Sequence, residues 1–79
     1  MKKRSAKDMR FQTKNYYGEI TPDTNRGWFD HEEYGDEYGG VLWFDNNMNL
    51  TDYDGVIELP KEVVQAIRDL GFHVGEEFE

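Results

Sequence analysis

The pattern of hydrophobic and polar positions is most regular over residues 40–70, where it predicts two β-strands and one helix. The first strand is the apolar run 41–44, and the second covers 49–53, with Leu50 as its clearest inward residue. The residues at 45–47 between them are all Asp or Asn, which tolerate the positive backbone angles of a tight hairpin turn. We therefore expect a β-hairpin in this part of the chain.

A helix is expected soon after this hairpin. Pro60 suits the first helical position, because the N–H that proline lacks would have no partner there. Val63, Ile67 and Leu70 recur at helical spacing and form one apolar stripe. Gly71 is the expected stop, since glycine readily adopts the left-handed conformation that ends many helices.

The preceding part of the chain has a weaker pattern. Residues 9–20 are rich in aromatic and β-branched side chains, which favour a strand, but the alternation breaks near Asn15. We expect one bent strand, with a bulge at Asn15 or at Gly18. Residues 21–40 contain turn residues and glycines, and we expect a long surface loop there with at most one helical turn over 30–34.

These elements predict a small single domain of the α+β class. It would consist of a three-stranded antiparallel sheet with one C-terminal helix on one face, in the order β-β-β-α. Residues 72–74 leave room for a short terminal strand. The domain is predicted to cover residues 9–79, and residues 1–8 are predicted to form a flexible basic arm.

The formal net charge of -8 is unevenly distributed along the 79 residues. Six of the nine cationic residues lie within the first 14 positions, whereas sixteen carboxylates and three cationic residues follow. Such a body repels nucleic-acid phosphates and anionic membranes and attracts basic partners. An acidic surface also keeps a small protein soluble, which is the simpler explanation of the same charge.

The composition also bears on the compartment. The chain has no cysteine, which excludes disulfides and a thiolate zinc site and favours a reducing cytoplasm. No apolar run follows the basic start, as a signal peptide would require, and the run 41–44 is too short to cross a membrane. We expect a cytoplasmic protein that does not associate with membranes.

Two weak signals for metal binding are present. The segment 45–51 places oxygen ligands at alternate positions, but Leu50 and Val56 stand where a calcium loop needs glycine and a bidentate carboxylate. His31 and His73 show no recognised zinc spacing. A hairpin turn and surface histidines explain these residues better, so we expect no metal and no cofactor.

No catalytic motif is recognisable. Ser5 is the only serine, cysteine is absent, and there is no glycine-rich phosphate loop. Carboxylates are too common for a pair of them to indicate a glycosidase, and so small a domain leaves little room for a substrate cleft. We expect no enzymatic activity.

The acidic and aromatic segment 28–38 is the strongest candidate for a binding surface. Its carboxylates are spaced about as densely as the phosphates of a nucleic acid, and its aromatic side chains resemble those of interface hot spots. The alternative is that the aromatic residues belong to the core and the carboxylates form a solvated rim. The predicted partner-binding residues are Trp28, Asp30, Glu32, Glu33, Tyr34, Asp36, Glu37 and Tyr38.

The small size, missing cysteines, acidic body and β-β-β-α unit resemble small phage-encoded inhibitors of host defence, especially anti-CRISPR proteins. The stretch LWFDNNMNLTDYDGVIELPKEVVQAIRDLGF is also similar to small proteins of phages and mobile elements. Because anti-CRISPR proteins share no common motif, this is a similarity of type. It implies a non-enzymatic inhibitor in the host cytoplasm that binds a CRISPR-Cas effector and blocks nucleic-acid access, in the manner of a DNA mimic.

In this hypothesis the acidic body binds a basic protein surface and does not bind nucleic acid directly. The alternative is a small structural or regulatory subunit of a larger complex, in which the acidic surface serves solubility only. Its contacts would then come from a sheet edge or a helix face, with Lys61, Gln65, Arg68 and the segment 72–74 as the important residues.

Overall fold

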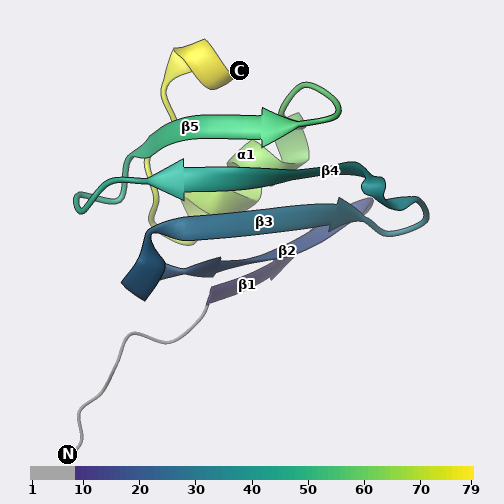
Figure 1. The fold of residues 1–79 in the computed structure, drawn as a ribbon, viewed down its shortest axis with the longest axis horizontal. Helices are drawn as coiled ribbons and strands as arrows, with labels where there is room; N and C mark the ends of the chain where they lie inside the picture. Colours follow the sequence, from purple (N-terminus) through teal and green to yellow (C-terminus); the bar gives the residue numbers. More distant parts are fainter. Residues whose placement is uncertain (1–8) are drawn as a thin grey trace, which may run out of the picture.

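The structure is a computed structural model that describes residues 9–79, so the predicted basic arm over residues 1–8 lies outside the described residues. The chain forms a five-stranded antiparallel sheet in the order β1-β2-β3-β4-β5, with one α-helix against one face (Figure 1). The strands are β1 (Met9–Gln12), β2 (Tyr16–Thr21), β3 (Arg26–His31), β4 (Gly35–Phe44) and β5 (Leu50–Gly55). The helices are α1 (Lys61–Asp69) and the short 3-10 turns η1 (Pro22–Thr24) and η2 (Glu76–Phe78).

The predicted three-stranded sheet is therefore wrong, although a sheet with a smaller helical part is present. The predicted bent strand over residues 9–20 is a hairpin, because the chain reverses near Asn15 and pairs β1 with β2. The predicted loop over residues 21–40 contains β3 and the first half of β4. The predicted helical turn over 30–34 is absent, since Asp30 and His31 belong to β3.

The reason for this error is that several glycines lie inside strands. On the face toward α1, the register aligns Phe11, Gly18, Phe29 and Gly40 in one row across β1 to β4. A Cβ at Gly18 would lie 2.2 Å from the carbonyl oxygen of Trp28 and 2.6 Å from the Phe11 ring. Glycine is required there by the neighbouring strands, and it does not mark a turn.

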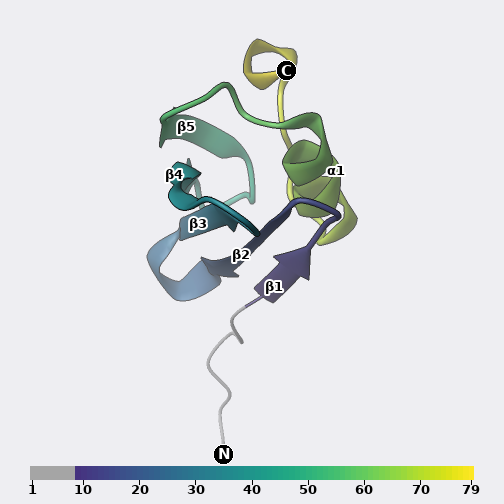
Figure 2. The same cartoon turned by 90° about the vertical axis from the view of Figure 1, so that its right-hand side faces the viewer.

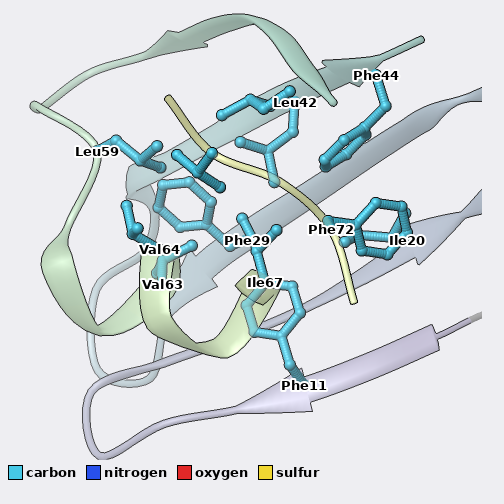
Figure 3. Close-up of a cluster of buried hydrophobic side chains, with 12 residues drawn as sticks. Phe11, Ile20, Phe29, Leu42, Phe44, Leu59, Val63, Val64, Ile67 and Phe72 are labelled. Atoms are coloured by element: carbon cyan, nitrogen blue, oxygen red, sulfur yellow. The ribbon is translucent and has the colours of Figure 1, made fainter. Parts of the chain in front are cut away.

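The sheet curves around α1, and the core fills the space between them (Figures 2 and 3). All five strands contribute buried residues from their inner face. The other buried residues come from α1 and from the segments that flank it. They are Phe11, Ile20, Phe29, Leu42, Phe44 and Leu50 from the sheet, Val63, Val64 and Ile67 from α1, and Leu59, Phe72 and Val74 from the flanking chain.

The prediction for the end of the helix is confirmed. Gly71 has a φ of 104°, its N–H donates to the carbonyl of Arg68 at 2.9 Å, and the N–H of Phe72 donates to Ile67 at 3.2 Å. These two bonds are those of a Schellman motif. At the other end, Pro60 is extended and precedes the helix as its N-cap, so it is not the first helical residue. In place of the short terminal strand considered over residues 72–74, this segment forms an isolated parallel bridge between His73 and Asn49.

The hairpin of β4 and β5 is also confirmed, and Asp45 organises its turn. The Asp45 carboxylate accepts N–H bonds from Asn47 at 2.8 Å and Asn49 at 2.9 Å, and from the Asn49 side chain at 3.0 Å. The backbone hydrogen bond from Asn49 is the largest of the effects that lower the pKa of Asp45.

No helix within residues 9–79 is long and apolar enough to span a membrane.

Glu62, in the first turn of α1, joins the helix to the β1–β2 hairpin. Its carboxylate accepts the hydroxyl of Thr13, the backbone N–H of Asn15 at 2.9 Å and the Asn15 side chain at 3.1 Å. The hydrogen bond from Thr13 is the main reason why the pKa of Glu62 is lowered. Since these donors come from a hairpin far away in sequence, Glu62 contributes to tertiary stability as well as to the start of the helix.

We predict that Gly18→Ala lowers the free energy of unfolding by about 1–3 kcal/mol, because the added methyl group meets a backbone carbonyl that cannot move freely. Urea denaturation would measure this loss. Gly75→Ala is the matched control, since the atoms nearest to a Cβ there belong to the flexible side chain of Glu77. Equal stability of the two variants would contradict the steric role of Gly18.

We predict that Glu62→Gln destabilises the fold by about 1 kcal/mol at pH 7, because a charged acceptor of three hydrogen bonds is lost. The folded-state pKa of Glu62 lies below its ordinary value of 4.5, so its contribution is present above that pH and is lost as the pH falls through the folded value. Urea midpoints between pH 7 and 3 should therefore fall less steeply for this variant than for the wild type. Glu58→Gln, at an exposed carboxylate, should follow the wild type.

Candidate protein-docking surface

One face of the sheet is left uncovered by the other elements of residues 9–79. Figure 2 shows α1 on one side of the sheet, and Figure 1 looks onto the opposite side, with α1 behind the strands. The alternation of buried and exposed residues agrees with this view: Phe29 is fully buried, whereas its neighbour Trp28 is 39% exposed. Trp28 lies on β3, the central strand, so its side chain marks the middle of the uncovered face.

The strand register shows which side chains share this face. Trp28 pairs with Glu19 of β2 on one side and with Val41 of β4 on the other, and Arg10 and Asp54 extend this row to the edge strands. Tyr17, which is 37% exposed, packs edge-to-face against Trp28 with ring centroids 5.9 Å apart. Two partly exposed aromatic rings therefore lie side by side on the sheet.

A shallow groove lies on each side of Trp28. The groove toward β1 is lined by Arg10, Gln12, Tyr17, Glu19 and Glu32 among others, and Arg10 and Glu19 form an ion pair across it at 3.8 Å. The groove toward β5 is lined by Asp30, Asp36, Val41, Asp54 and Val56 together with glycine backbone. The two grooves differ in charge, because the first contains a cation and the second contains carboxylates only.

The carboxylates of the segment 30–37 are not neutralised by the rest of the described domain. Within residues 9–79 the ion pairs are Arg10 with Glu19 and Arg68 with Glu79, and neither involves this segment. Burial raises the pKa of Asp30, and the nearby charge of Asp36 raises it further. The two carboxylates therefore lie close enough to repel one another, which makes this end of the face a site of concentrated negative charge.

The structure places six of the eight predicted partner-binding residues on the uncovered face or at the turn beside it, and the other two elsewhere. Trp28, Asp30 and Asp36 meet at one groove of the uncovered face, and Glu32 lines the other groove, where Gln12 donates to its carboxylate. Glu33 and Glu37 are exposed near the turn between β3 and β4. Tyr34 and Tyr38 do not join this surface.

Tyr34 and Tyr38 instead pack around His31. The His31 ring lies 4.9 Å from Tyr34 and 5.8 Å from Tyr38, and it also contacts Tyr16 at 5.0 Å. Tyr16 in turn packs edge-to-face on the buried Phe29, which places this cluster on the α1 side of the sheet. The two tyrosines are still 49% and 39% exposed, so the alternative that assigned the aromatic residues to the core describes them only in part.

His31 also holds the turn between β3 and β4. Its Nδ1 atom accepts the backbone N–H groups of Glu33 at 3.0 Å and of Tyr34 at 3.2 Å. An imidazole nitrogen accepts a hydrogen bond only when it is unprotonated. These two hydrogen bonds to Nδ1 hold the turn that carries the carboxylates of Glu32 and Glu33.

Several residues of the surface were not predicted from the sequence. Tyr17, Val41, Asp54 and Val56 line the grooves beside Trp28, and Val56 is 69% exposed. A signal was present in the alternation of Tyr16 and Tyr17, which point to opposite faces of β2. This alternation places Tyr17 beside Trp28 only when the pairing of β2 with β3 is known.

The residues considered as metal ligands either accept hydrogen bonds from their own turn or lie in different parts of the domain. No group of three or more His, Asp or Glu side chains within residues 9–79 is arranged to hold a metal ion. The Asp45 carboxylate accepts hydrogen bonds from its own turn. His31 pairs with the start of β4, whereas His73 bridges to Asn49, beyond the end of that strand.

The residues of the alternative docking site are mostly engaged within the domain. The Arg68 guanidinium donates to the carbonyl of Val74 at 2.8 Å and to the Glu79 carboxylate at 3.1 Å, and Gln65 donates to Asp69 at 2.9 Å. Phe72 and Val74 are buried. These contacts hold the chain end against α1.

The fold and the surface together define a small α+β domain with an exposed aromatic and acidic sheet face. Comparisons of the chain with protein-family models, with curated proteins and with solved structures found no match in any of the three. Its function is therefore inferred from the chemistry of this face.

We predict that His31→Ala increases the exchange of the Glu33 and Tyr34 amide protons by about tenfold, because both lose their acceptor. Protection factors from NMR hydrogen exchange would measure this, with the amide of Leu42 in the buried part of β4 as an internal reference. His31→Asn should retain part of the protection, since its side-chain oxygen can accept the same bonds. Unchanged protection in the alanine variant would disprove the role of Nδ1.

Proposed function

We propose that this domain is a non-enzymatic inhibitor that docks onto a basic, nucleic-acid-binding surface of another protein and blocks nucleic-acid access. The docking surface is the uncovered sheet face together with the acidic turn between β3 and β4. The partner class is a CRISPR-Cas effector in the host cytoplasm, as the resemblance to anti-CRISPR proteins implies. The observation that carries the proposal is the exposed Trp28 in the middle of the sheet, beside carboxylates that no cation of residues 9–79 neutralises.

The uncovered face is more apolar than the solvent-exposed face of an antiparallel sheet usually is. An antiparallel sheet with one face in water normally carries polar side chains on that face. Here the central positions hold Tyr17, Trp28, Val41 and Trp43, and the charged residues lie around them. An aromatic centre with a polar rim is the arrangement of a protein–protein interface, in which the centre contributes most of the binding free energy.

The charge indicates the kind of partner. Residues 9–79 carry sixteen carboxylates and five cationic side chains, so the domain repels nucleic acid and anionic lipid. A basic channel that normally holds DNA or RNA has the opposite charge. Carboxylates at the rim would increase the rate of association with such a channel, and salt would reduce that effect.

We predict that replacing Asp30, Asp36 and Asp54 with asparagine weakens binding to a CRISPR-Cas effector by at least about tenfold, because three charges are lost beside the aromatic centre. Asp69→Asn with Glu76→Gln and Glu77→Gln is the control of equal charge change, away from this face. Affinity would be measured by surface plasmon resonance at low and high salt, with and without competing DNA. Thermal melting would confirm that both variants fold.

The wild type should bind more weakly in high salt and in the presence of DNA, and should inhibit DNA binding by the effector. Equal weakening in both triple variants would reduce the role of the carboxylates to a general effect of net charge. Capture of a partner without a nucleic-acid-binding surface, in a salt-resistant manner, would favour the alternative of a structural or regulatory subunit.

A further inference from the structure

The groove on the β5 side of Trp28 combines three kinds of surface. The Trp28 side chain contributes an aromatic wall, Val41 and Val56 contribute apolar contacts, and Asp30, Asp36 and Asp54 contribute carboxylates. Gly39 and Gly40 of β4 and Gly55 of β5 also line it, and they contribute main chain without a side chain. This lining suits a ligand that is partly apolar, planar enough to stack on an indole ring, and cationic.

The position of Asp30 is built into the sheet. Its carboxylate lies against Gly39, where a Cβ would approach Oδ1 to 2.6 Å, so the glycine leaves the space that the carboxylate occupies. Asp36 lies near enough for its charge to raise the pKa of Asp30, in addition to the larger effect of burial. A cation placed between the two carboxylates would relieve this repulsion.

The opposite groove provides a contrast. Of its two carboxylates, Glu19 pairs with Arg10 at 3.8 Å and Glu32 accepts a hydrogen bond from Gln12, and the Arg10 guanidinium would repel an incoming cation. Among the carboxylates that flank Trp28, those of the β5 side have no cationic partner within residues 9–79. The charge complementarity thus favours one side of the indole.

We infer that this groove receives an arginine side chain of the partner protein, with its guanidinium plane against the Trp28 indole and its N–H groups on the carboxylates of Asp30 and Asp36. The inference rests on the proposed function and names the chemistry of its contact. Arginine fits better than lysine because its planar group stacks on aromatic rings, is more weakly hydrated and bonds carboxylates in a bidentate manner. A lysine ammonium would retain the charge attraction only.

The test uses the full chain and two synthetic octapeptides, both acetylated and amidated, in which glycine alternates with either arginine or lysine. Two-dimensional ¹H–¹⁵N NMR follows the indole N–H resonances during titration, and Trp43, in another row of the same face, serves as the reference. We expect the arginine peptide to shift the Trp28 resonance and to bind at least about threefold more tightly than the lysine peptide. The Trp28→Leu variant should lose most of this preference, and the part that remains comes from the carboxylates.

A second variant tests the carboxylates without removing the ring. Asp30→Asn with Asp36→Asn should weaken the arginine peptide more than the lysine peptide, because the bidentate bonds are lost together with the charge. In the wild type, affinity for the arginine peptide should decrease as the pH falls through the raised pKa of Asp30, since protonation removes one acceptor. This additional pH dependence should be absent in the double variant.

The outcomes separate this inference from the proposed function. Equal, salt-sensitive binding of both peptides without a Trp28 shift would overturn the arginine site and leave the docking onto a basic surface intact. A preference for arginine that is undiminished in Trp28→Leu would also overturn it. Failure of both peptides to bind at low salt would count against the proposed function as well.

Discussion

The fold depends on the way in which large side chains and glycines alternate across the sheet. The inner row Phe11, Gly18, Phe29, Gly40 and Gly55 crosses all five strands. The Phe11 ring lies over Gly18, and the Tyr53 ring lies over Gly40 and Gly55 and stacks on Phe29 at 6.0 Å. Few aromatic rings thus cover a wide sheet, and the absence of side chains between them allows the sheet to curve around one short helix (Figure 2).

The opposite, outer face of the sheet is left without a covering helix. The apolar stripe of α1 packs on the inner face, and residues 9–79 contain no second α-helix that could cover the outer one. The aromatic residues of the outer face, above all Trp28, are therefore left in contact with water. Since exposed aromatic area on a rigid central strand is already ordered, covering it with the partner that we propose would cost little conformational entropy.

The acidic end of the face is held by contacts from several elements. His31 accepts two backbone N–H groups of the turn between β3 and β4, and Glu62 of α1 fixes the hairpin of β1 and β2 beside it. The N–H of Glu32 also donates to the carbonyl of Asn15 at 2.7 Å, which joins the two turns. The carboxylates that we propose as contacts consequently lie on supported backbone, as precise recognition requires.

Local sequence determined the parts of the protein whose causes are local. The β4–β5 hairpin follows from Asp and Asn at its turn, and the end of α1 follows from Gly71 after an amphipathic run. The acidic charge of the body is likewise a property of the composition. These features depend on neighbouring residues alone and need no information from distant parts of the chain.

Tertiary structure decided the number of strands and the membership of the site. Gly18 and Gly40 favour turns when considered alone, but they serve here as space for rings that other strands contribute. Trp28 and Tyr34 looked equivalent in an acidic segment, yet the register of β3 exposes the first on the outer face while the second joins the cluster around His31. A side chain's face depends on strand pairing, and pairing is determined by packing between residues far apart in the chain.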